Sequence, residues 1–190
     1  MTGQSGEYYL TGVMETGCGI KLNEDGSFEF FYSYGALDRH GYGTWKLLSE
    51  NEIELNTNYE GLIPFSIILE EKRSSPGIKI FIPNYNQMLQ RNTTIAITGN
   101  GTKEEVVADE NGIFNFNSTT ASEIVVTCIF YFDNPATLIP LNSTSNYLEL
   151  APNHHLPLVH FDHAKFEVAE NTLTGNLHLI DDYKKYRFEK

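Results

Sequence analysis

The stretch IKLNEDGSFEFFYSY, residues 20–34, decides the fold of this chain. Apolar and polar residues alternate on both sides of the dipeptide Asp25-Gly26, from Ile20 before it to Tyr34 after it. A two-residue period places successive side chains on opposite faces of an extended strand. Asp-Gly is a preferred turn between two antiparallel strands. The stretch therefore predicts a β-hairpin that turns at this dipeptide.

The same alternation recurs along the chain, so we expect an all-β protein. Trp45 and Leu47 share one face of the next segment, and glutamates alternate with Ile53 and Leu55. No segment shows the 3.6-residue apolar period of an amphipathic helix. The apolar run of residues 124–132 is typical of a central strand that is buried on both faces.

Two domains are expected. The segment EEKRSSPG, residues 70–77, is first charged and then rich in turn-forming residues, which makes it the best candidate boundary. We predict an antiparallel β-meander over residues 6–72, packed against a β-sandwich over residues 76–190. An open meander leaves unpaired sheet edges. We therefore expect it to dock on the second unit, and association into homo-oligomers is a further expectation.

Composition limits the function. The chain has 190 residues, a formal net charge of −12 and only 13 lysines and arginines, so binding of nucleic acid is disfavoured. Two cysteines, Cys18 and Cys128, are too few for a disulfide scaffold. No apolar run is long enough to span a membrane. No signal peptide is visible, so we expect a cytoplasmic protein by default, or a periplasmic or secreted one if the N-terminus was trimmed.

The first third of the chain resembles an uncharacterised family of bacterial proteins. The resemblance lies in GEYYLTGVME at residues 6–15, DGSFEF at residues 25–30 and YGALDRHGYGTW at residues 34–45. The family has no known activity, so the resemblance implies none.

Residues 78–132 resemble a carboxypeptidase-regulatory-like, transthyretin-type β-sandwich. The resemblance is carried by Ile95 and Ile97, by VADENGIFNF at residues 107–116, and by the apolar run that follows. It implies an Ig/transthyretin-like β-sandwich for the second domain, in a family of non-catalytic modules. A shared fold does not fix a function.

A glycine-rich loop over residues 34–45 is the first candidate binding site. Its aspartate and histidine could act as acid and base, its arginine could hold a carboxylate, and its aromatic rings could stack on a sugar or another flat ligand. Alternatively, the polar residues bond locally and the tryptophan packs in the core. The candidate ligand-binding residues are Tyr34, Asp38, Arg39, His40, Tyr42 and Trp45.

A histidine cluster is the second candidate site. Four of the six histidines fall within residues 154–163. On a strand, His160 and Asp162 would point the same way, and His154 could supply a third ligand. Imidazole and carboxylate together suit Zn, Fe or Mn. The alternative is a solvated loop followed by a half-exposed strand.

The common enzyme motifs are missing from the sequence, including the P-loop, the dinucleotide fingerprint and Gly-x-Ser-x-Gly. We therefore expect a non-enzymatic protein without a cofactor that binds a small molecule or another protein. One alternative is a small metal-dependent enzyme that uses the histidine cluster. Another is a lipocalin-like carrier of an apolar molecule, with a cavity lined by Phe28, Phe30, Ile53 and Leu55.

Overall fold

The computed structural model describes residues 3–58, 60–83, 87–142 and 144–190. Strands dominate these residues, and the helical content is one short α-helix and one 3-10 turn. The all-β class predicted from the sequence is confirmed.

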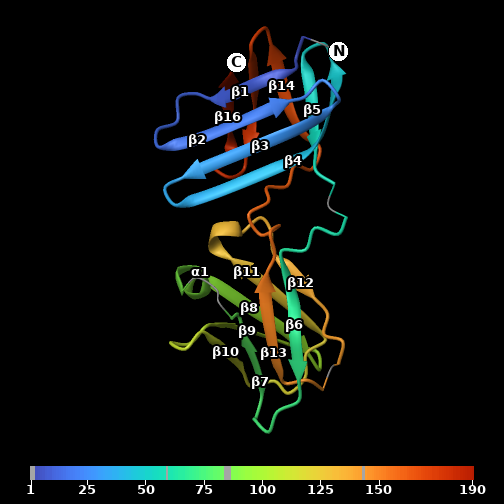
Figure 1. Ribbon diagram of the computed structural model, residues 1–190, viewed down its shortest axis with the longest axis vertical. Helices are drawn as coiled ribbons and strands as arrows, with labels where there is room; N and C mark the ends of the chain where they lie inside the picture. Colours follow the sequence, from blue (N-terminus) through green and yellow to red (C-terminus); the bar gives the residue numbers. More distant parts are fainter. Residues whose placement is uncertain (1–2, 59, 84–86, 143) are drawn as a thin grey trace. The chain divides into compact units, whose positions relative to one another are not determined.

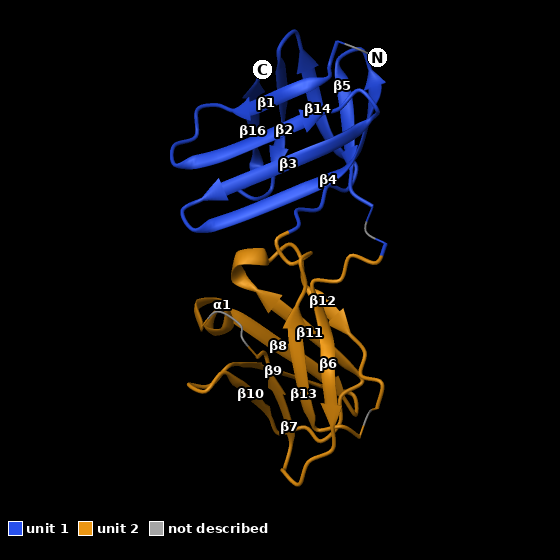
Figure 2. Ribbon diagram, in the orientation of Figure 1, with its two compact units in different colours: residues 1–60, 158–190 blue, residues 61–157 orange. Residues whose placement is uncertain are grey.

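The chain forms two compact units (Figures 1 and 2). Unit 1 combines residues 1–60 with residues 158–190, and unit 2 consists of residues 61–157. The sequence of unit 2 is thus inserted within that of unit 1. This division differs from the expected one at residues 70–77.

Unit 1 is a closed barrel of eight strands in which every neighbouring pair is antiparallel. Around the barrel the order is β1-β2-β3-β4-β5-β14-β15-β16, and β16 pairs again with β1. The strands are β1 (Gly6–Leu10), β2 (Thr16–Leu22), β3 (Ser27–Tyr34), β4 (Leu37–Ser49), β5 (Glu52–Asn56), β14 (Ala164–Ala169), β15 (Thr172–Leu177) and β16 (Asp181–Glu189).

Consecutive strands of the barrel are neighbours in sequence except at β5 and β14, where unit 2 is inserted. Two hydrogen bonds join the ends of the insertion. The N–H of Thr57 donates to the carbonyl of Phe161 at 2.7 Å, and the N–H of Phe161 donates to Oγ1 of Thr57 at 3.2 Å. The expected meander is therefore not open. Residues 164–189 pair with β5 and β1 because an antiparallel sheet with unpaired edges gains backbone hydrogen bonds by closing.

The hairpin at Asp25-Gly26 is confirmed. Leu22 lies opposite Phe28 in the register of β2 and β3. Gly26 has a φ of 83°, which favours glycine, and the N–H of Ser27 donates to Oδ1 of Asp25 at 2.9 Å. Local turn chemistry and strand periodicity thus agree on one register.

The barrel encloses a single apolar core to which all eight strands contribute. Alternate residues of each strand enter it, as the two-residue period predicts. Among the largest of its fully buried side chains are Tyr8, Ile20, Leu22, Phe28, Ile53, Leu55, Phe166 and Phe188.

Unit 2 contains two four-stranded sheets, with strand orders β10-β7-β13-β6 and β12-β11-β8-β9. The pairing of β13 with β7 is parallel, and the other pairs are antiparallel. The first sheet contains β6 (Phe65–Glu71), β7 (Ile78–Phe81), β10 (Ile113–Phe116) and β13 (Tyr147–Pro152). The second sheet contains β8 (Thr93–Gly99), β9 (Thr102–Val107), β11 (Glu123–Cys128) and β12 (Ala136–Leu138). Helix α1 spans Gln87–Arg91, and the 3-10 turn η1 spans Ile129–Tyr131.

One buried cluster takes side chains from both sheets of unit 2, including Ile80 and Phe114 from the first and Ile95 and Ile124 from the second. Strand β11 lies inside its sheet, as predicted, but only its alternate residues are fully buried, so the predicted burial on both faces is wrong. The strand ends at Cys128, and the chain continues as η1. The apolar run was therefore too long to be one strand.

Candidate functional site

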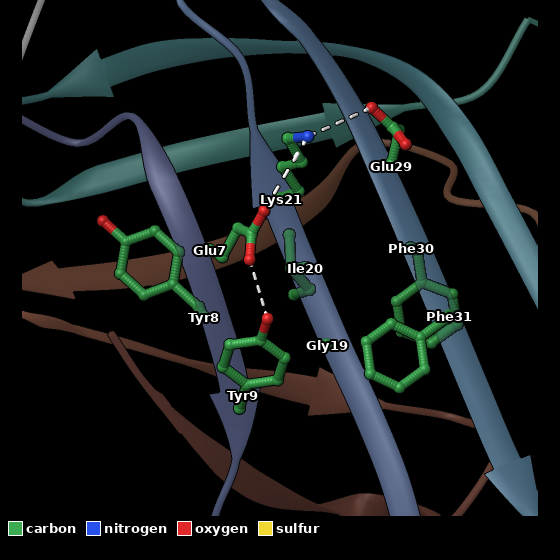
Figure 3. A pocket seen from close by; sticks show the side chains of 9 residues that line it. All are labelled: Glu7, Tyr8, Tyr9, Gly19, Ile20, Lys21, Glu29, Phe30 and Phe31. Atoms are coloured by element: carbon green, nitrogen blue, oxygen red, sulfur yellow. Dashed lines mark hydrogen bonds and ion pairs between the residues drawn. The ribbon is translucent and has the colours of Figure 1, made fainter.

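A groove on the outside of the barrel is the candidate functional site, and we call it the outer groove. It encloses about 270 Å³ over strands β1, β2 and β3 (Figure 3). Its lining residues are Glu7, Tyr8, Tyr9, Gly19, Ile20, Lys21, Glu29, Phe30 and Phe31.

An aromatic ring covers a glycine in this groove, and a second aromatic residue lies opposite the glycine on the other neighbouring strand. The strand register places Tyr9 opposite Gly19, and Gly19 opposite Phe31. The ring centroids of Tyr9 and Phe31 are 6.3 Å apart with an interplanar angle of 59°, and these residues are 49% and 45% exposed. A Cβ on Gly19 would lie 2.5 Å from Cε1 of Phe31. The missing side chain therefore lets the Phe31 ring lie directly on the strand.

A row of charges crosses the same strands two residues along. Glu7 lies opposite Lys21, and Lys21 lies opposite Glu29. Nζ of Lys21 is 3.8 Å from Oε1 of Glu7 and 4.0 Å from Oε1 of Glu29. The hydroxyl of Tyr9 donates to Oε2 of Glu7 at 2.7 Å, which links the charged row to the aromatic one (Figure 3). Two carboxylates and one ammonium leave this row with one net negative charge.

The phenols of the groove are held in their protonated form. The hydrogen bond to Glu7, followed by the charge of that carboxylate, raises the pKa of Tyr9 above its usual value. Burial raises the pKa of Tyr8. Both phenols therefore stay neutral at neutral pH. Tyr8 is a core residue whose hydroxyl donates to the carbonyl of Gln4 at 2.7 Å, so only the phenol of Tyr9 faces the groove.

The neighbouring strand β4 extends both rows. His40 lies opposite Phe31, and Tyr42 lies opposite Glu29. The rings of His40 and Tyr42 are stacked, with centroids 6.4 Å apart and an interplanar angle of 10°. Together with Tyr9 and Phe31, these rings give the outer surface of β1–β4 four exposed aromatic side chains.

The segment 34–45 is a hairpin and not the glycine-rich loop that the sequence suggested. After a turn at residues 35 and 36, strand β4 begins at Leu37. A Cβ on Gly41 would lie 3.1 Å from the Phe161 ring, and one on Gly43 would lie 2.2 Å from the carbonyl oxygen of Asn56. These glycines therefore permit close packing inside a strand, which a pattern-based interpretation mistakes for loop flexibility.

The six ligand-binding residues predicted from the sequence divide between two faces. Asp38, His40 and Tyr42 are exposed, whereas Arg39 and Trp45 are buried. Successive residues of a strand point to opposite faces, so the structure does not bring all of them together.

The buried members make backbone contacts. Nη2 of Arg39 donates to the carbonyl of Leu158 at 2.9 Å, and Nε1 of Trp45 donates to the carbonyl of Asn23 at 2.8 Å. Tyr34, 51% exposed, lies at the end of β3. Of the predicted set, His40 and Tyr42 adjoin the outer groove.

The sequence reasoning missed the aromatic pair of the groove. A signal was present, because Phe31 occupies a polar-face position within a strand whose alternate residues are apolar. The glycines Gly17 and Gly19 on the preceding segment mark the strand that such a ring could cover. An apolar residue on the polar face, opposite a glycine, is the pattern that would have found the site.

The predicted metal ligands belong to different units. His154 lies in unit 2, whereas His160 and Asp162 lie in unit 1. Within the described ranges, no three His, Cys, Asp or Glu side chains form a group suited to a metal ion. His155 is partly buried, with its Nδ1 atom covered, and desolvation lowers its pKa, so the imidazole is neutral near neutral pH. A metal site built on these histidines stays a prediction.

His163 takes part in an ion-pair cluster on the outside of the barrel. Oε1 of Glu54 lies 2.8 Å from Nζ of Lys46 and 3.1 Å from Nδ1 of His163. The hydrogen bonds from Lys46 and then His163 lower the pKa of Glu54. This cluster joins β4, β5 and the start of β14, and we interpret it as structural.

A second groove, in unit 2, is mainly apolar. It encloses about 370 Å³ between β6 and β12, and Ile68, Ile139 and Leu141 border it with large exposed fractions. The carboxylate of Glu70 accepts hydrogen bonds from the N–H groups of Leu141 and Asn142 at 2.9 and 3.2 Å. Both oxygens of the Glu70 carboxylate thus already accept hydrogen bonds from the neighbouring loop.

In the part of the chain that the structure describes, no helix has both the length and the apolar character needed to cross a membrane. Comparisons of the chain with protein-family models, with curated proteins and with solved structures found no match. The candidate site therefore has to be judged on its own geometry.

Proposed function

We propose that the chain is a non-enzymatic binding protein that holds its ligand in the outer groove. The observation that carries this proposal is the half-exposed pair Tyr9 and Phe31 on either side of Gly19, beside an ion-paired row of charges. Ligand sites typically combine aromatic surface with a few polar groups that fix orientation. The outer groove has this composition.

The chemistry of the groove supports binding over catalysis. General acid–base catalysis works best with a group whose pKa lies near the operating pH. The pKa of the Tyr9 phenol is shifted away from that range, and the carboxylate of Glu7 is engaged by Tyr9 and Lys21. These groups suit the recognition of hydroxyl and amino groups.

A carrier with an internal site is the second candidate, because lipocalins are also closed barrels of about eight strands. The side chains that would line its cavity include Phe28 and Phe30, and both belong to the packed core. The ring of Phe161 meets theirs edge-on, with centroids 5.2 and 5.0 Å away. A ligand inside would have to displace these rings, so we favour a site outside.

For unit 2 we propose an Ig/transthyretin-like β-sandwich that serves as a non-catalytic module. The buried cluster shared by its two sheets supports this arrangement. The edge strands of its sheets, β6, β9, β10 and β12, offer backbone groups for association with another chain, whereas the closed barrel has no such edge. Any homo-oligomer is therefore proposed to form through unit 2.

The proposal is tested by nuclear magnetic resonance on the ¹⁵N-labelled full chain, titrated with a panel of metabolites, amines and oligosaccharides. We expect at least one compound to shift the amide signals of Tyr9, Gly19 and Phe31 while its own spectrum shows no chemical conversion. Tyr183, which is 99% exposed on β16, provides a matched control. The Tyr183→Ala variant should respond like the wild type. Conversion of the compound, or shifts confined to other surfaces, would contradict the proposal.

A further inference from the structure

The outer groove also points to a class of ligand, and this step rests on the function proposed above. We infer that the groove binds a carbohydrate, a neutral chain of linked sugar rings that lies across strands β1–β4. Three properties of the surface carry the inference: its exposed rings, its paired charges and its length.

The exposed rings suit the apolar face of a sugar. A pyranose ring presents C–H bonds on one face, and these carry slight positive charge, whereas the face of an aromatic ring is slightly negative. Tyr9 and Phe31 offer two such faces about half exposed, and Tyr42 is 42% exposed on β4. Tyr9 and Phe31 are separated by one strand, β2, and Tyr42 lies on the strand next to that of Phe31, so consecutive sugar units could stack on these rings.

The paired charges suit hydroxyl groups. Carboxylates accept and ammonium groups donate hydrogen bonds that are stronger than those between neutral groups. Lys21 lies within 4.0 Å of both Glu7 and Glu29. A cationic ligand would compete with this ammonium, and an anionic ligand would meet two carboxylates on a chain of net charge −12. A neutral ligand with many hydroxyls faces neither cost.

The length of the surface favours a chain of sugars over a single ring. The register aligns Tyr9, Gly19, Phe31 and His40 in one line across four strands. With strands about 4.8 Å apart, this line is about 14 Å long. The Phe31 ring covers Gly19 within this line, so the aromatic surface continues across β2.

A purely structural role for the rings is the competing explanation. An aromatic residue beside a strand glycine can stabilise the sheet by covering the exposed backbone. Phe31 makes this contact with Gly19 in any case. The two explanations differ in what they require of the ring, because covering the backbone needs only apolar bulk, whereas sugar stacking needs an aromatic face.

The test is isothermal titration calorimetry of the full chain with cellohexaose, maltohexaose, chitohexaose and xylohexaose, and with choline as a cationic probe. We expect one of the saccharides to bind. The Phe31→Leu variant keeps apolar bulk over Gly19, so it should melt close to the wild type yet bind that saccharide at least about tenfold more weakly. Tyr9→Ala should weaken binding similarly, and the control Tyr183→Ala should leave it unchanged.

The outcomes separate this inference from the proposed function. If choline binds with the same dependence on Phe31 and no saccharide does, the carbohydrate class is wrong and the binding function stands. Saccharide binding that Phe31→Leu and Tyr9→Ala leave intact overturns the assignment to the groove. If none of the five probes binds, the carbohydrate inference fails, and the wider NMR panel then decides the proposed function separately.

Discussion

At the scale of single residues, two strand glycines of the barrel differ sharply in the space around them. A Cβ on Gly43 would lie 2.2 Å from the carbonyl oxygen of Asn56 and 2.8 Å from Cε1 of Phe28. The nearest atom to a Cβ on Gly17 would be 3.8 Å away, which is ordinary van der Waals contact. Gly43 is therefore required by the packing of β4 against the last residue of β5, whereas no such contact requires Gly17.

We predict that Gly43→Ala lowers the free energy of unfolding by about 1–3 kcal/mol, because a backbone carbonyl cannot give way as a flexible side chain can. The matched variant Gly17→Ala should change it by no more than about 0.5 kcal/mol. Urea unfolding followed by the fluorescence of Trp45 measures both values. Equal effects of the two substitutions on the free energy of unfolding would show that the close contact at Gly43 does not make glycine necessary there.

At the scale of elements, the two units use the same turn. Asn23 opens the turn before β3, and Asp109 opens the turn before β10. The N–H of the glycine three residues later, Gly26 or Gly112, donates to the carbonyl of the opening residue at 3.2 or 3.0 Å, and Phe-x-Phe follows in the strand. Oδ1 of Asp109 accepts the N–H of Ile113 at 3.0 Å, and Oδ2 accepts Nδ2 of Asn115 at 2.9 Å. The backbone hydrogen bond from Ile113 is the main reason that the pKa of Asp109 lies below its usual value of 3.8.

The lowered pKa of Asp109 determines how this residue's contribution to stability depends on pH. A carboxyl whose pKa is lower in the folded state binds a proton less readily there, so its contribution to stability is present above about pH 4. That contribution is lost as the pH falls through the folded-state pKa. We predict that Asp109→Asn destabilises the protein most at pH 7, and that its difference from the wild type shrinks towards pH 3. Urea unfolding across this range measures the difference, and a gap that stays constant would contradict the prediction.

At the scale of the whole molecule, the barrel is complete without unit 2. All eight of its strands come from residues 6–56 and 164–189, and Thr57 and Phe161 hydrogen-bond to each other where the insertion leaves and returns. Among the residues that the structure describes, none from unit 2 belongs to the core cluster of the barrel. The two segments of the barrel that unit 2 separates in sequence are thus held together by hydrogen bonds between barrel residues.

We predict that the barrel folds when residues 61–157 are replaced by a short Gly-Ser link. The shortened chain should unfold cooperatively, and its near-UV circular dichroism should keep the signal that Trp45 gives in the folded barrel. A matched chain that also lacks β16 (Asp181–Glu189) should not fold, because it loses the strand that joins β15 to β1. Failure of the first chain to unfold cooperatively would show that the barrel depends on unit 2.

The sequence could predict what depends on neighbouring residues. The alternation at Phe28 and Phe30 and the turn at Asp25 are local, and both gave the correct strand and hairpin. Closure of the barrel pairs β14 with β5 and β16 with β1, which are more than a hundred positions apart in sequence. A period-two pattern identifies a strand but does not show which strand it pairs with. Phe31 escaped notice for a related reason, since its importance arises from glycines on another strand.

The interruption of the barrel between β5 and β14 has a consequence for how the protein is made. A ribosome releases the first five strands, then all of unit 2, and only then the three strands that complete the barrel. Translation proceeds at about 5–20 residues per second, so the edge strands of the incomplete barrel stay unpaired for at least several seconds. The inserted unit can fold during this time. Chaperone dependence during translation should therefore fall on the N-terminal strands.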